Sequence, residues 1–101
     1  MQKPKMIVPE STSFIRGKFR NDSSMVEKLP DELKRRILTY LKEPEPGTVG
    51  DMPMIDPVTG VKYDSTNILR EKDGFAWSSA AIYMLEKYDI RLSDDFLRLF
   101  E

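Results

Sequence analysis

Two turn sequences in the middle of the chain constrain its fold more than any other feature. In Asp56-Pro57-Val58-Thr59-Gly60, an aspartate opens the turn, the proline presets the next φ angle, and the glycine suits a left-handed residue. Asp73-Gly74 is the residue pair favoured in tight hairpin turns. The first turn predicts strands at 52–55 and 61–64, and the second predicts strands at 67–71 and 75–77. Together they predict a small antiparallel β-meander.

A helix is predicted before the meander, over residues 30–42. Pro30 suits the first helical position, and the acidic pair Asp31-Glu32 suits the first turn because it complements the helix dipole. Helical spacing gives one apolar stripe, formed by Leu33, Ile37, Tyr40 and Leu41. The proline-rich segment 43–47 ends the helix.

Two more helices are predicted after the meander. Ser78 or Ser79 caps a helix that runs through Tyr88, and Ser93 caps a short last helix with Asp94 and Asp95 in its first turn. The C-terminal side chains are apolar enough to predict a docked terminus. Residues 1–28 give weaker signals, for short strands at 6–8 and 13–19 and a turn at 21–24. The expected fold is one α+β domain spanning residues 1–101, with the meander packed against three helices.

The chain has 101 residues without cysteine or histidine, which excludes several kinds of chemistry. A Ser-His or Cys-His triad, a disulfide, a thiolate nucleophile and a His- or Cys-ligated metal are all ruled out. The dispersed aspartates do not follow a calcium-loop pattern, and Asp56 and Asp73 are explained as turn residues. We therefore expect no catalytic, metal or cofactor site, and no enzymatic activity.

The longest apolar run has six residues, at 80–85, and nothing resembles an export signal. We therefore expect a cytoplasmic protein that does not span a membrane. Lys34-Arg35-Arg36 is the single dense basic run and lacks an aromatic platform, which disfavours a nucleic-acid partner.

The charges are unevenly distributed along the chain. Residues 1–45 carry ten basic and seven acidic residues, a net +3, whereas residues 46–101 carry six basic and ten acidic residues, a net −4. One interpretation is two differently solvated faces. The other is that the acidic half faces a basic partner, since complementary charge speeds encounter and fixes register.

Residues 29–41 resemble the opening of an F-box, with Leu29-Pro30, an acidic pair and then Ile37-Leu38-Thr39-Tyr40-Leu41. That resemblance implies a small helical bundle that recruits a ubiquitin-ligase adaptor. The F-box continuation is missing here, because the turns at 56–60 and 73–74 predict hairpins instead.

A second resemblance runs from residue 29 to the end. It rests on Leu-Pro-x-x-Leu from residue 29, Asp56-Pro57-Val58-Thr59-Gly60, Asp73-Gly74-Phe75-Ala76-Trp77, a helix with Tyr83 and Glu86-Lys87-Tyr88, and Leu92-x-x-Asp95-Phe96-Leu97. This order is similar to that of small immunity proteins encoded beside bacterial polymorphic or contact-dependent toxins. Some of those proteins carry the motif Asp-Gly-x-Trp-x-Trp and a closing Leu-Pro-x-x-Phe. This chain has Phe75 in place of the first Trp of the first motif, and Ser93 in place of the Pro of the second.

The resemblance implies a function without catalysis, metal or export. An immunity protein binds its cognate toxin in the producing cell's cytoplasm and blocks it stoichiometrically. Such toxins are often nucleases with basic clefts, which an acidic surface suits. The expected partner is then a basic toxin domain; the alternatives are the F-box-like module or another small interaction protein. If the acidic half makes the contact, the expected contact residues are Asp51, Asp56, Tyr63, Asp64, Glu71, Asp73, Asp94 and Asp95.

Overall fold

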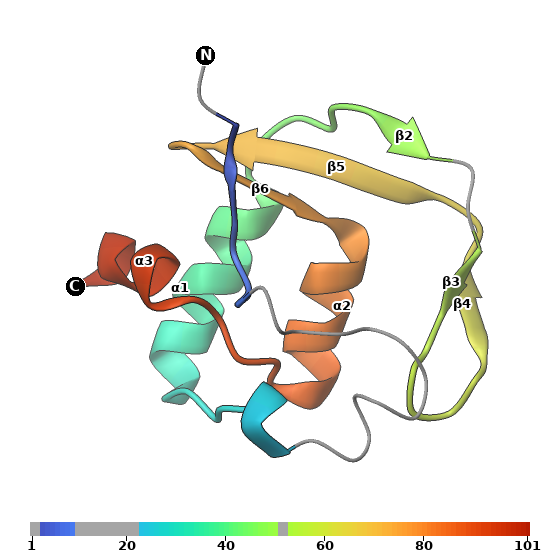
Figure 1. The fold of residues 1–101 in the computed structure, drawn as a ribbon, viewed down its shortest axis with the longest axis horizontal. Coiled ribbons are helices and arrows are strands. Elements are labelled where there is room, and N and C mark those ends of the chain that lie inside the picture. The colour runs from blue at the N-terminus through green and yellow to red at the C-terminus, as the bar shows by residue number, and fades with distance from the viewer. Residues whose placement is uncertain (1–2, 10–22, 51–52) are drawn as a thin grey trace.

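The structure is a computed structural model that describes residues 3–9, 23–50 and 53–101. Its strands are β1 Lys5–Met6, β2 Val49–Gly50, β3 Met54–Ile55, β4 Lys62–Asp64, β5 Asn67–Lys72 and β6 Phe75–Ser78. Its α-helices are α1 Asp31–Lys42, α2 Ser79–Tyr88 and α3 Asp94–Leu97, with 3-10 helices η1 Ser23–Met25 and η2 Arg98–Phe100 (Figure 1). The predicted α+β class with three α-helices is confirmed.

The strands form two sheets and not one continuous meander. β5 and β6 pair antiparallel through the predicted turn, in which Asp73 and Gly74 both have positive φ angles of 54° and 82°. β2 pairs antiparallel with β5, and β1 joins β6 in parallel, so the sheet order is β1-β6-β5-β2. The other predicted hairpin, β3–β4, forms a separate two-stranded sheet. Turn sequences specify pairing within a hairpin, but not which hairpins join one sheet.

The strands between α1 and α2 also distinguish this fold from the helical bundle that the F-box resemblance implies. Five of the six strands, β2 to β6, lie in this part of the described chain. The thirteen residues that resemble an F-box therefore form an amphipathic helix in a different architecture.

The predicted helix ends agree with the structure to within a residue. Pro30 immediately precedes α1 and does not occupy its first position, since its ψ angle of 141° is extended. The Ser93 hydroxyl caps α3 as predicted, accepting a hydrogen bond from the Phe96 N–H at 3.3 Å. Ser78 precedes α2, but its side chain makes no capping bond. The predicted strand at 6–8 is shifted, because β1 ends at Met6. The strand predicted at 13–19 lies outside the described residues, as do residues 21–22 of the turn predicted at 21–24, whose residues 23–24 begin η1.

The core is centred on Phe96, which is completely buried in α3. Its ring lies against the rings of four aromatic residues at centroid distances of 5.4–6.4 Å: Tyr40, Phe75, Trp77 and Phe100. The Trp77 indole N–H also donates to the Leu41 carbonyl at 3.0 Å, which joins β6 to α1. The C-terminus is therefore docked as predicted, although Leu99 is exposed.

Truncating Phe96 should destabilise the whole fold. Phe96→Ala removes the ring that α1, β6 and η2 share, and a buried Phe→Ala change costs about 3–5 kcal/mol. Urea unfolding measures the loss. The matched control is Leu99→Ala in η2, which should cost less than about 1 kcal/mol because Leu99 is exposed. Equal losses in the two variants would contradict a core centred on Phe96.

Candidate functional site

The partner-contact residues expected from the sequence lie in two separate groups. One group lies at the β5–β6 hairpin and the start of α3: Glu71, Asp73, Asp94 and Asp95. The other lies on the β3–β4 hairpin, at the opposite end of the molecule (Figure 1): Asp56, Tyr63 and Asp64. Asp51 lies outside the described residues. The structure therefore does not gather these residues into one face.

Several of the expected contact residues already have partners within the chain. Asp73 accepts a 2.7 Å hydrogen bond from the Tyr40 hydroxyl; burial and this bond raise the pKa of Tyr40. Asp95 pairs with Lys5 of β1 at 3.4 Å. Asp64 accepts backbone N–H bonds from the two residues that follow it. All three carboxylates are exposed, so these bonds leave them accessible.

The opposite charges of the two halves pair with each other instead of occupying two faces. Lys34 of α1 lies 2.7 Å from Asp89 at the end of α2, and Lys42 of α1 pairs with Glu86 of α2. The pair between β1 and α3 described above is a third link between the halves. Ion pairs between the two halves therefore neutralise part of the net −4 of residues 46–101.

Asp56 differs from the other expected contacts because it is only 1% exposed. Its Oδ1 accepts the backbone N–H of Val58 at 2.7 Å and that of Thr59 at 3.0 Å, as expected of an aspartate that opens a turn. The Gly60 N–H donates to the Asp56 carbonyl at 2.8 Å, and Gly60 has a φ of 75°. The predicted turn is confirmed. A carboxylate this buried does not fit the expected role of Asp56 as a surface contact.

The second oxygen of Asp56 lies against α2. Its Oδ2 accepts hydrogen bonds from the Tyr83 and Tyr88 hydroxyls, each at 2.6 Å, and the Lys87 ammonium lies 3.3 Å away. Tyr63 of β4 stacks on Tyr83 with ring centroids 3.7 Å apart and planes within 3°. We call these residues the Asp56 cluster: Asp56, Tyr63, Tyr83, Lys87 and Tyr88.

The cluster holds its central carboxylate in the charged form. Burial alone raises the pKa of Asp56, but the hydrogen bonds from Tyr83, Tyr88 and the turn outweigh it and keep that pKa well below its usual range. Burial and the bond to Asp56 raise the pKa of Tyr88. Burial and the neighbouring Tyr83 and Asp56 raise the pKa of Tyr63 to about 12. The charged carboxylate is therefore a structural group that joins the hairpin to α2.

Part of the Asp56 cluster can be predicted from the sequence. Tyr83 and Lys87 are four residues apart and therefore share one face of α2. The Lys87 ammonium also donates to the Tyr83 hydroxyl at 3.1 Å. Which carboxylate these side chains would meet depends on where the β3–β4 hairpin packs, and no local pattern specifies that.

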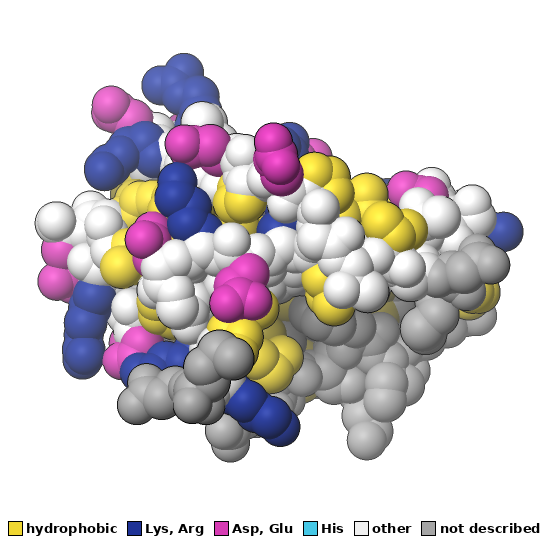
Figure 2. Space-filling model, turned by 90° about the horizontal axis from the view of Figure 1, so that it is seen from above, with side chains coloured by type: hydrophobic (Ala, Val, Ile, Leu, Met, Phe, Trp, Pro, Cys, Tyr) yellow, Lys and Arg dark blue, Asp and Glu magenta, His cyan; other side chains and the backbone are white. Residues whose placement is uncertain are grey.

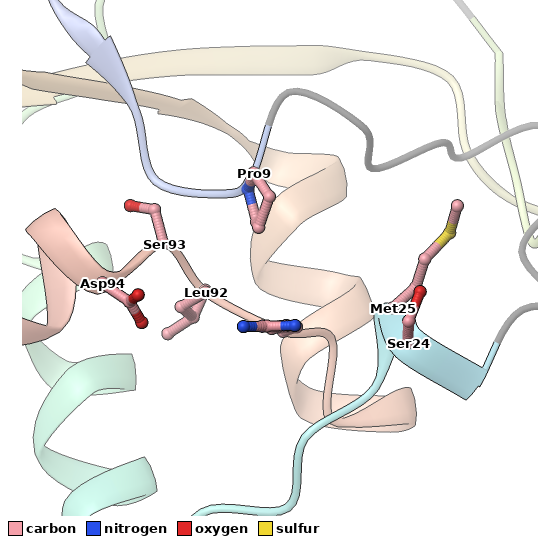
Figure 3. A pocket seen from close by; sticks show the side chains of 7 residues that line it. Pro9, Ser24, Met25, Leu92, Ser93 and Asp94 are labelled. Atoms are coloured by element: carbon pink, nitrogen blue, oxygen red, sulfur yellow. The ribbon is translucent and has the colours of Figure 1, made fainter.

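A hollow of about 290 Å³ lies between η1 and the loop that joins α2 to α3 (Figure 3). It is lined by Pro9, by Ser24 and Met25 of η1, and by residues 91–94. The Ser93 hydroxyl is already used as the cap of α3, and the Arg91 N–H donates to the Met25 carbonyl at 2.7 Å. Within the described part of the chain, no three acidic residues are grouped as metal ligands.

The four-stranded sheet has one face that α1, α2 and α3 cover and one that carries exposed side chains. Phe75 and Trp77 point toward the helices, so their strand neighbours point away. The register and the alternation along β5 then place six side chains on the other face, here called the outer sheet face: Met6, Asn67, Leu69, Glu71, Ala76 and Ser78. Met6 is 60% exposed and Leu69 is 46% exposed. Seen from above, the molecule shows apolar side chains among charged ones (Figure 2).

In comparisons with protein-family models, curated proteins and solved structures, the chain matches none of them. Among the described helices, none is long and apolar enough to cross a membrane.

Replacing Asp56 should change both stability and its dependence on pH. Asp56→Asn removes charge-assisted hydrogen bonds and should cost roughly 1.5–3 kcal/mol at pH 7. Because the folded-state pKa is lowered, the unfolded chain binds a proton first on acidification, at a pKa of about 3.9. The stability that Asp56 contributes is therefore present above that pH and is lost as pH falls toward the folded-state value.

Urea unfolding of wild type and Asp56→Asn between about pH 7 and pH 2.5 tests this. The difference in unfolding free energy between the two proteins should shrink below about pH 4. A difference that stays constant over the whole range would show that Asp56 is not held in its charged form by the cluster.

Proposed function

We propose that this chain is an immunity protein that binds a cognate bacterial toxin in the cytoplasm and neutralises it stoichiometrically, without catalysis or a cofactor. The partner is a basic toxin domain, most simply a nuclease. The resemblance to small immunity proteins from residue 29 to the end supports this proposal, and a folded domain that exposes apolar side chains on a sheet suits a binding role.

The observation that carries the proposal is the outer sheet face. Met6 and Leu69 are large apolar side chains that remain solvent-exposed on regular strands, where a partner can bury them. Glu71 lies next to Leu69 along β5 on the same face, and Ala76 of β6 separates it from Met6, since the register pairs Ala76 with both Glu71 and Met6. Apolar contacts beside a carboxylate match a partner that combines apolar and basic side chains.

This surface replaces the broad acidic half as the proposed interface. Glu71 is exposed, and it makes no ion pair with another described side chain. Asp73, in the adjacent turn, is also exposed. A local pair of carboxylates beside an apolar patch can still steer a basic partner, although most other carboxylates of the acidic half serve the fold.

Co-expression with the toxin domain encoded beside the gene for this chain tests the proposal. The wild-type chain should restore growth and form a 1:1 complex with the toxin domain. Leu69→Lys should weaken the complex at least about tenfold, because it removes an apolar contact and opposes a basic partner. Isothermal titration calorimetry measures this affinity.

The matched control is Val61→Lys, which changes an apolar side chain that is even more exposed than Leu69 and lies beside β4, outside the four-stranded sheet. It should bind the toxin domain as the wild type does. Failure of the wild-type chain to restore growth or to bind would reject the immunity function itself. An affinity that Leu69→Lys leaves unchanged would reject only the outer sheet face as the interface.

A further inference from the structure

The β3–β4 hairpin is attached to the rest of the molecule differently from the other strands. It forms its own two-stranded sheet, and such a hairpin is marginal in water unless something holds it. Two of its apolar side chains point to solvent, Ile55 at 52% and Val61 at 63% exposed. Met54 is buried, and Val58 packs against the edge of the core. The hairpin therefore packs few apolar side chains against the rest of the molecule.

Both carboxylate oxygens of Asp56 accept hydrogen bonds, one within the hairpin and the other from α2. Oδ1 closes the turn through the Val58 and Thr59 N–H groups, and Oδ2 binds Tyr83 and Tyr88 on α2. One carboxylate therefore fixes the shape of the hairpin and its position on the helix together. The Lys87 ammonium lies 3.3 Å from Oδ2, but the Lys87 side chain is half exposed and the Asp56 side chain is buried.

The ring of Tyr63 completes the contact from the second strand of the hairpin. It lies flat on Tyr83, which also donates its hydroxyl to Asp56. Loss of the Asp56 bonds frees Tyr83 from the turn and leaves the stacked pair and the packing of Met54 and Val58 as the remaining links. The hairpin is therefore held on α2 by a small number of contacts. A segment with few contacts typically opens before the rest of the protein unfolds.

We propose that residues 54–64 form a flap that opens as a unit while the four-stranded sheet and the helices stay folded, and that the Asp56 carboxylate is its anchor. Opening uncovers the Tyr83 and Tyr88 rings of α2. This inference does not depend on the proposed immunity function, because it concerns the opposite end of the molecule from the β5–β6 turn.

Native-state hydrogen exchange followed by NMR tests the flap in the wild-type chain. The Asp56 and Gly60 amides report on the hairpin, since their bonds to Val61 and Asp56 carbonyls close it. The Ile37 and Leu41 amides inside α1 report on the core. The hairpin amides should exchange at least about tenfold faster than the core amides, with a weaker dependence on low denaturant concentrations. Equal rates and equal dependence would overturn the flap.

Asp56→Asn tests the anchor, with Asp64→Asn as the matched control on the next strand. Asp64 also accepts backbone N–H bonds from its own turn, but it does not reach α2. Asp56→Asn should speed exchange of the hairpin amides at least about tenfold over the control. The ring-current shift that stacking on Tyr83 gives Tyr63 should diminish in parallel. Hairpin exchange that is the same in both variants would overturn the role of Asp56.

Discussion

The burial of Phe96 is the interaction on which the rest of this structure depends. In a chain of this length without disulfides, the elements must be held by side-chain packing, and Phe96 contacts rings from α1, β6 and η2. The same region joins the two ends of the described chain, because the Ser93 N–H donates to the carbonyl of the buried Ile7 at 2.8 Å. The C-terminal helix is thus the element against which α1 and the sheet are positioned.

The helices and hairpin turns could be predicted because their determinants are local. Pro30, Ser93 and Asp73-Gly74 each act within a few residues of their own position, and the structure has a helix end or a turn at each. The parallel pairing of β1 with β6 could not be predicted in this way. It joins residues about seventy positions apart through backbone bonds, which carry no side-chain pattern.

Asp56 shows where prediction of the candidate site succeeds and where it stops. Its turn role follows from the sequence, since a carboxylate before Pro57 can accept the N–H groups of the residues that follow. Its second oxygen bonds to tyrosines 27 and 32 residues further on. That contact exists only because the hairpin packs on α2, so a residue that looks like a surface carboxylate in the sequence is buried in the fold.

The same reasoning explains why net charge along the chain was a poor guide to the surface. Charges of opposite sign in the two halves can pair within the folded chain. Here α1 packs beside α2, and the lysines of α1 form ion pairs with carboxylates of α2 and its C-terminal end. With a net charge of −1, long-range attraction of a basic partner is weak. Under the proposed function, affinity for the toxin domain would then come from short-range contacts, which exposed Met6 and Leu69 can make and solvated carboxylates at the rim cannot.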